Sequence, residues 1–364
     1  MYRRYLFVLF ALCGLFLAYG LYTAASFEPL VGDLTRVGGF AERDYGWNGA
    51  EEQFVPPLAE QGSLDGQYPI IVVGDSFSTR TTNDRQTPYG SFWIDFLAAD
   101  TGLRVGVFDI EKIALLRILA APILQRSPPR LIILELSERT LKTRLAHGSD
   151  CTDGEAWVTA SFPLAKEQPH PVRFRRQVAA PSAEALVDPI ADHWRKEILR
   201  RAFGDTVAPA RRLPLARGDL FTSRRAGELL IYADDLLKAN WSDADWQTFR
   251  CALLDAQRRV MANGQTSFAF VLAPDKSSAY APWLPPGPWQ VDAAPRLAAA
   301  AGLRMPRVDL ALRAAIAAGT RDVYLPDDSH WSTTGSGIVA RSVIEYVQAV
   351  TPPPTPAADL SASR

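Results

Sequence analysis

The stretch from Pro69 to Ser78, PIIVVGDSFS, constrains the fold more than any other part of the chain. Its first five residues are apolar and mostly β-branched, which is the composition of a strand buried on both faces. The run stops at Gly74 and Asp75, residues that favour a sharp turn. Two similar runs follow at 103–110 and 130–136, with helix-like segments between them. This alternation predicts an α/β domain with a doubly wound parallel sheet, an α/β/α sandwich.

Ser76 stands directly after the first of these strands, where open α/β sheets bind their ligands. At that position its hydroxyl can face a substrate, and the adjacent backbone N–H can face a developing oxyanion. Gly-Asp-Ser is also ordinary turn chemistry after a strand, so the tripeptide alone does not establish a nucleophile.

A polar segment near the other end of the chain strengthens the catalytic interpretation. It runs from Leu325 to Gly337, LPDDSHWSTTGSG, and contains one of only four histidines. A serine nucleophile needs a base, and that base needs a carboxylate that fixes its tautomer. His330 with either Asp327 or Asp328 supplies both groups on one loop.

A GDS element near the start and an Asp-x-(x)-His loop near the end resemble the SGNH (GDSL-like) hydrolase superfamily. Within it, the chain is most similar to the AlgX/AlgJ-like group of polysaccharide O-acetyltransferases. The resemblance covers about residues 68 to 350, apart from an insert. It rests on four segments: GDSF at 74–77, Glu138-Arg139 after a strand, PDKSSAY at 274–280 and DSHW at 328–331.

The resemblance implies that Ser76 is the nucleophile, His330 the base and Asp328 the orienting acid, with Asp327 as the alternate. It also implies substrate contacts, with structural roles as the alternative; for Arg139 that alternative is an ion pair with Glu138. The residues concerned are Arg139, Lys276, Tyr280 and Trp331. We expect no cofactor and no metal.

Two departures from the family pattern stand out. The Asn and Gly that complete the oxyanion hole in the wider superfamily have no convincing counterpart here. In the alginate enzymes the Asp-His element precedes the serine, whereas here the serine comes first. The spatial arrangement of a triad does not depend on that order, but the inference about a particular substrate is weaker.

The N-terminus carries an uncharged stretch from Tyr5 to Phe27, preceded by Arg3 and Arg4. Its length is enough to span a bilayer, and the arginines predict a cytoplasmic N-terminus with the rest exported. We therefore expect residues 1–27 to be a signal anchor in the inner (cytoplasmic) membrane, with the catalytic domain in the periplasm. A cleaved signal peptide is the alternative.

We expect a linker at 28–67, an SGNH-like catalytic domain at 68–350 with an Arg-rich insert at about 147–240, and a disordered tail at 351–364. The arginines of the insert indicate either contact with an anionic lipid or glycan, or a solvated basic surface. Cys151 and Cys251 form an even pair in the exported part, and the sequence leaves open whether they are bridged.

The net charge of −1 argues against a dedicated nucleic-acid binder. The resemblance implies a membrane-anchored periplasmic O-acetyltransferase that moves an acetyl group through Ser76 to a glycan hydroxyl. Its partners would be a poly- or oligosaccharide acceptor and a multi-pass membrane O-acyltransferase as acetyl donor. Two alternatives remain open: an SGNH esterase or glycan deacetylase, and a catalytically silent glycan-binding scaffold of an export complex.

Overall fold

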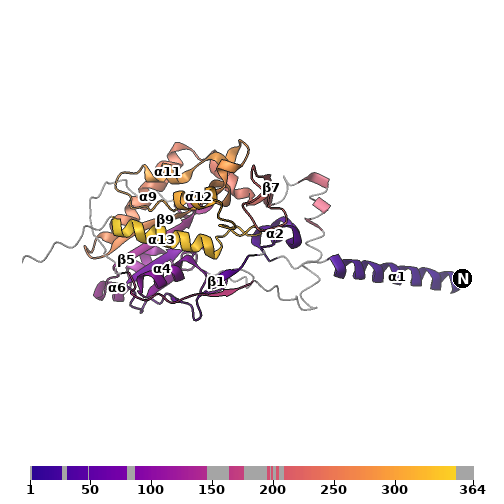
Figure 1. Cartoon of the computed structure of the whole chain (residues 1–364), viewed down its shortest axis with the longest axis horizontal. Coiled ribbons are helices and arrows are strands. Elements are labelled where there is room, and N and C mark those ends of the chain that lie inside the picture. The colour runs from indigo at the N-terminus through magenta and orange to yellow at the C-terminus, as the bar shows by residue number, and fades with distance from the viewer. Residues whose placement is uncertain are drawn as a thin grey trace, which may run out of the picture.

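A five-stranded parallel sheet forms the centre of the domain, with the strand order β2-β4-β3-β5-β9 (Figure 1). This computed structural model describes residues 2–26, 31–47, 49–79, 87–145, 164–175, 195–196, 198–199, 202–204 and 209–349. The strands are β2 (Ala59–Gln61), β3 (Ile70–Gly74), β4 (Val105–Asp109), β5 (Leu131–Ser137) and β9 (Ser267–Ala273). The prediction of an α/β domain built on a parallel sheet is confirmed.

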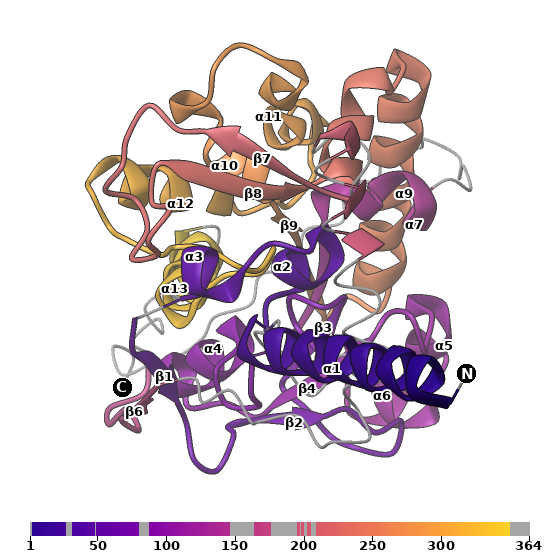
Figure 2. The same cartoon turned by 90° about the vertical axis from the view of Figure 1, so that its right-hand side faces the viewer.

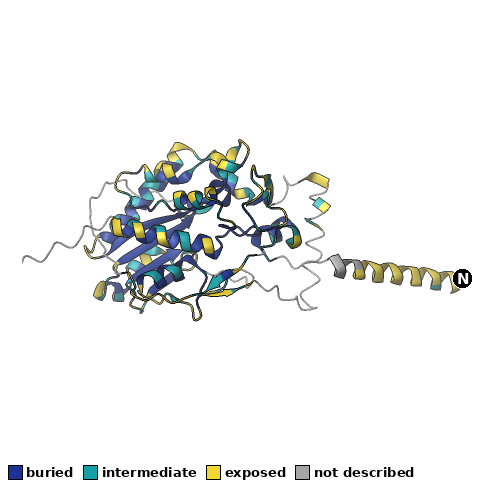
Figure 3. Cartoon of the chain, in the orientation of Figure 1, coloured by how far each residue is buried: buried dark blue, intermediate teal, exposed yellow. Residues whose placement is uncertain are grey.

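Helices cover both faces of this sheet. On one face α4 (Trp93–Thr101), α12 (Val308–Ala317) and α13 (Thr333–Ala349) pack against Ile70 and Val72 of β3. On the other face α5 (Leu115–Leu119), α6 (Pro122–Arg126), α9 (Asp243–Met261) and α11 (Ala293–Ala298) pack against Ile71 and Val73. Alternate residues of one strand thus feed two separate cores, which explains why the central strands read as continuous apolar runs (Figure 3).

The segment at 28–67, expected to be a linker, contributes to the domain. It contains α2 (Asp33–Gly38), α3 (Glu42–Tyr45), β1 (Glu51–Gln53) and β2. β2 pairs with β4 as the edge strand of the main sheet. Its sequence, AEQ, carries no apolar run because its residues are only partly buried, so the local pattern gave no strand signal.

The expected insert is partly built into the domain as well. β6 (Val172–Phe174) pairs with β1, and β7 (Ala210–Pro214) forms a hairpin with β8 (Glu228–Tyr232). Leu229, Leu230 and Ile231 of β8 are fully buried. α2 packs against this hairpin over the carboxyl edge of the sheet (Figure 2). Residues 146–163 and 176–194 lie outside the described residues, whereas eight of the eleven arginines between 171 and 225 lie within them.

Short elements complete the described chain. They are η1 (Glu138–Thr140), α7 (Leu141–Arg144), η4 (Ala233–Asn240), α10 (Lys276–Ala279), η5 (Ala281–Trp283) and η6 (Pro288–Gln290). Cys251 on α9 is disulfide-bonded and Cys13 is free. Cys151, the candidate partner of Cys251, lies outside the described residues, as does the tail at 351–364.

The N-terminal helix α1 (Tyr2–Ser26) extends away from the domain (Figure 1). Among the described residues, its stretch Tyr2–Leu21 is the one helix long and apolar enough to cross a membrane, and none of that stretch is buried. A membrane anchor and a signal sequence both have these properties.

Candidate active site

The turn that follows β3 presents Ser76 at the carboxyl edge of the sheet. Asp75 shapes this turn: its Oδ1 accepts the Phe77 N–H at 3.1 Å, and its Oδ2 accepts the Ser137 N–H at 2.8 Å. The second bond ties the turn to the end of β5. A Cβ on Gly74 would lie 2.6 Å from the Glu135 carboxylate and from Ser78 Oγ, so only glycine fits beneath the turn.

Glu135 supports the turn from below and was not singled out as a site residue from the sequence. Its Oε2 accepts the Asp75 N–H at 3.1 Å and the Ser78 hydroxyl at 2.8 Å. Trp93 Nε1 donates to Ser78 Oγ at 3.0 Å. Burial, followed by the neighbouring Asp75 charge, raises the pKa of Glu135 well above its ordinary value.

His330 joins Ser76 to Asp328 by two hydrogen bonds. Its Nε2 lies 2.8 Å from Ser76 Oγ, and its Nδ1 lies 2.6 Å from Asp328 Oδ1. The Phe77 ring packs against the imidazole with a centroid distance of 4.7 Å. A hydroxyl, an imidazole and a carboxylate in this order can deprotonate the hydroxyl and stabilise the resulting imidazolium.

The two candidate acids therefore contact different parts of the loop. Asp328 contacts the imidazole with its side chain. Asp327 contributes its backbone carbonyl, which accepts the N–H groups of Leu34 and Thr35 at 3.2 Å each. The two residues stand in a turn closed by the Asp328 N–H, which donates to the Leu325 carbonyl at 3.3 Å.

A second carboxylate, that of Asp33, lies on the same side of the imidazole. Asp33 Oδ2 is 3.7 Å from His330 Nδ1, and it accepts the Ser329 hydroxyl at 2.6 Å. Asp33 Oδ1 accepts the Ser329 N–H at 2.8 Å. No sequence signal marked Asp33, because the contact joins residues 296 positions apart.

The pKa of His330 reflects these neighbours. Burial disfavours the imidazolium and lowers the pKa, but the Asp328 charge and hydrogen bond and the Asp33 charge outweigh it, so the pKa is raised above its ordinary value. Arg139 is the opposing cation. The site therefore favours a proton on His330 more than water does.

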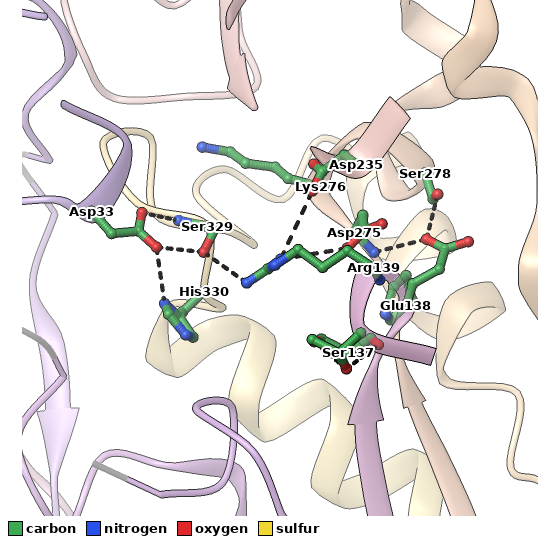
Figure 4. Close-up of polar contacts among 12 residues, drawn as sticks. Asp33, Ser137, Glu138, Arg139, Asp235, Asp275, Lys276, Ser278, Ser329 and His330 are labelled. Atoms are coloured by element: carbon green, nitrogen blue, oxygen red, sulfur yellow. Dashed lines mark hydrogen bonds and ion pairs between the residues drawn. The ribbon is translucent and has the colours of Figure 1, made fainter. Parts of the chain in front are cut away.

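Arg139 extends from η1 toward the histidine loop (Figure 4). Its guanidinium donates to Asp275 and to Ser329 Oγ, both at 3.4 Å. It lies over the rings of Phe77 and Tyr232, at 5.9 and 5.1 Å from their centroids. The ion-pair partners of Arg139 in the described residues are Asp275, at 3.4 Å, and Asp235, at 3.9 Å, whereas Glu138 pairs with the buried Lys238 at 2.8 Å.

The other three expected substrate contacts are buried. The Lys276 ammonium donates to the backbone carbonyls of Leu325, Pro326 and Asp328 at 2.6 to 3.1 Å, and burial lowers its pKa to about 8. Tyr280 is fully buried, and Trp331 packs against Phe77 at 4.6 Å. These contacts support the shape of the loop, and substrate contact by the three side chains stays a prediction.

One group of possible metal ligands occurs among the described residues, formed by Asp33, Asp328 and His330, with ligand atoms within 4.8 Å of one another. Both imidazole nitrogens already have hydrogen-bond partners, Ser76 and Asp328. A metal bound to His330 would have to replace one of them, so the residues fit a proton-transfer chain better than a metal centre.

The histidine loop, β8, β9 and the connecting elements form one continuous part of the chain. Residues 229–362 match the family model described as "SGNH hydrolase-like domain, acetyltransferase AlgX". The AlgX-type match includes Asp328 and His330 and begins after Ser76 and Arg139. No curated protein and no solved structure shows significant similarity to the chain. An AlgX-type SGNH domain is, at the coarse level, that of an acyltransferase- or hydrolase-like enzyme.

Proposed function

We propose that this protein is a membrane-anchored periplasmic O-acetyltransferase that modifies a glycan. The observation that carries the proposal is the hydrogen-bonded chain Ser76–His330–Asp328 in a protein whose residues 229–362 match the AlgX acetyltransferase model. A purely structural turn serine has no need of a buried imidazole oriented by a carboxylate.

In the first half of the reaction Ser76 accepts the acetyl group. Its Oγ bonds to the acetyl carbonyl carbon while its proton passes to His330 Nε2, at 2.8 Å in the free site. The leaving group of the donor departs with that proton, and an acetyl ester remains on Ser76. Asp328 holds the tautomer that exposes Nε2 as the base and stabilises the imidazolium.

In the second half the ester is passed to a sugar. The acceptor hydroxyl gives its proton to His330 Nε2, its oxygen bonds to the acetyl carbon, and Ser76 Oγ departs and regains the proton. Water in place of the sugar would release acetate, so an esterase or deacetylase differs from the transferase only in this acceptor.

Stabilisation of the oxyanion falls to the Ser76 N–H and to Arg139. A donor of this class contributes about 3–4 kcal/mol. Arg139 is fixed by Asp275 and by Ser329, beside the histidine, so its charge is held near the site without a substrate. We propose it as the residue that contacts an acetyl or sugar oxygen in place of the missing Asn.

The unburied apolar helix α1 supports an anchored protein. Acetyl-CoA is not expected outside the cytoplasm, so the acetyl group would come from a multi-pass membrane O-acyltransferase. The acceptor is a poly- or oligosaccharide.

The test is incubation of the purified full chain in detergent with a soluble acetyl ester, with and without oligosaccharides. Acetylated sugar supports the transferase, and free acetate alone supports the esterase. No turnover under either condition would favour the glycan-binding scaffold, provided that a cooperative thermal transition shows the sample to be folded.

A further inference from the structure

The segment that follows α1 is built into the histidine loop. The backbone N–H groups of Leu34 and Thr35 donate to the Asp327 carbonyl, and the Asp33 N–H donates to Asp328 Oδ2 at 3.1 Å. A Cβ on Gly32 would lie 2.0 Å from the Asp327 carbonyl oxygen, so the two backbones are in direct contact. Asp33 is only seven residues after Ser26, the last residue of α1.

This segment has its own support within the N-terminal region. Glu42 Oε1 accepts the Val31 and Gly32 N–H groups at 2.6 and 3.0 Å, and it also accepts the Thr35 hydroxyl. Glu42 therefore holds the chain on both sides of Asp33 in place, and Asp33 is 4% exposed. Both of its oxygens accept hydrogen bonds from Ser329, one from the N–H and one from the hydroxyl, so the carboxylate holds that residue at two points.

We propose that Asp33 is a positioning residue for His330, which fixes the loop through Ser329 and places a second negative charge on the Nδ1 side of the imidazole. The effect on catalysis rests on the proposed function. The effect on the imidazole itself rests only on the contacts.

The charges around the pair define what a substitution should do. His330 is faced by Asp328 from its own loop, by Asp33 from α2 and by Arg139 from η1. Asp33 is faced by Asp328, His330 and Arg139, and by the Tyr232 hydroxyl of β8. At 3.7 Å the Asp33 charge favours the imidazolium, whereas Arg139 opposes it. Removing the Asp33 charge should therefore make His330 a weaker base.

The experiment follows the titration of His330 by NMR in the full chain, labelled with ¹³C-histidine and held in detergent. The chain has four histidines, and the signal missing from His330→Asn assigns the one required. Asp33→Asn and Asp33→Ser remove the charge, and both are measured in case one does not fold. Asp44→Asn removes a carboxylate from the same N-terminal region without contact to the site. Ser329→Ala removes the hydroxyl bond and keeps both carboxylates.

The expected result is a His330 titration shifted to lower pH in the Asp33 variants and unshifted in Asp44→Asn and Ser329→Ala. In turnover assays, the Asp33 variants should have a lower kcat. The ascending limb of their pH profile should move to lower pH by as much as the His330 titration moves in the NMR experiment. A His330 titration in the Asp33 variants that coincides with that of the unmodified chain would overturn the proposal. The NMR result does not require turnover, so it stands or fails separately from the acetyltransferase proposal.

Discussion

His330 Nε2 and Ser76 Oγ lie within hydrogen-bond distance although 254 residues separate them in the chain. Ser76 comes from the turn after β3, and His330 comes from the loop before α13. Their contact is the relationship on which most of the following predictions depend.

Replacing Ser76 with Ala should abolish acyl transfer and leave the thermal transition unchanged, because within the described part of the chain its hydroxyl bonds to His330 and supports no other group. Ser78→Ala provides the crossed control. It removes the hydroxyl between Glu135 and Trp93 and should cost about 1–3 kcal/mol of stability while the Ser76–His330 contact remains. Activity retained in Ser76→Ala would refute the catalytic role.

Asp328→Asn should be far more damaging than Asp327→Asn. Loss of the orienting carboxylate leaves the imidazole in the wrong tautomer and can cost on the order of 10⁴ in turnover. Asp327 supplies its backbone carbonyl to α2, and Asn keeps that group. Steady-state kinetics on both variants test the ranking, and the reverse order would assign the orienting role to Asp327.

Activity should fall as the pH is lowered through the pKa of His330. The base must be neutral to accept the Ser76 proton, and its pKa is raised above 6.5 by Asp328 and Asp33 against the effect of burial. The ascending limb of kcat/KM against pH should therefore have its midpoint above 6.5. A midpoint below that value would mean that burial outweighs the two carboxylates.

Lys238→Met should destabilise the protein by about 3–5 kcal/mol, because it leaves the carboxylates of Glu138 and Asp275 buried without their ammonium partner. Urea denaturation measures the loss. The matched control is Lys142→Met, which removes a more exposed ion pair with Asp245 and should leave the midpoint nearly unchanged. Equal midpoints for the two variants would contradict a structural role for the buried cluster.

A reporter enzyme fused after Phe27 should lie outside the cytoplasm, because Arg3 and Arg4 retain the N-terminus inside. Alkaline phosphatase and a cytoplasmic reporter at the same junction form the matched pair. Activity of the cytoplasmic reporter would overturn both the orientation of α1 and the export of the domain.

Strands β3, β4 and β5, and the residues that form the Ser76–His330–Asp328 contacts, could be predicted because each has a local signature. β3 is a continuous apolar run, and the histidine loop carries its acid two residues before the base. Asp33 and Lys238 have no such signature. Asp33 contacts Ser329, 296 positions away, and Lys238 contacts Glu138, 100 positions away. In the sequence alone, a single acid or lysine in a polar segment resembles an exposed surface residue.

The segment at 28–67 was expected to be a linker because it also lacks a local sequence signature. Its edge strand pairs by backbone hydrogen bonds, which any sequence can make, and α2 is short, with only Leu34 and Val37 in an apolar cluster beside its backbone bonds to Asp327. Lys276 shows the converse case. The family resemblance implies a substrate contact for it, and in the structure its ammonium binds three carbonyls of the histidine loop.

The distance along the chain between Ser76 and His330 has a consequence for biosynthesis. Ribosomes add about 5–20 residues per second, so the serine is made roughly 13–50 s before the histidine that activates it. During that interval the nascent chain holds a serine turn without its base, and Asp33 waits without its partner Ser329. Under the proposed mechanism, a chain that ends before residue 330 carries the nucleophile without the base that would activate it.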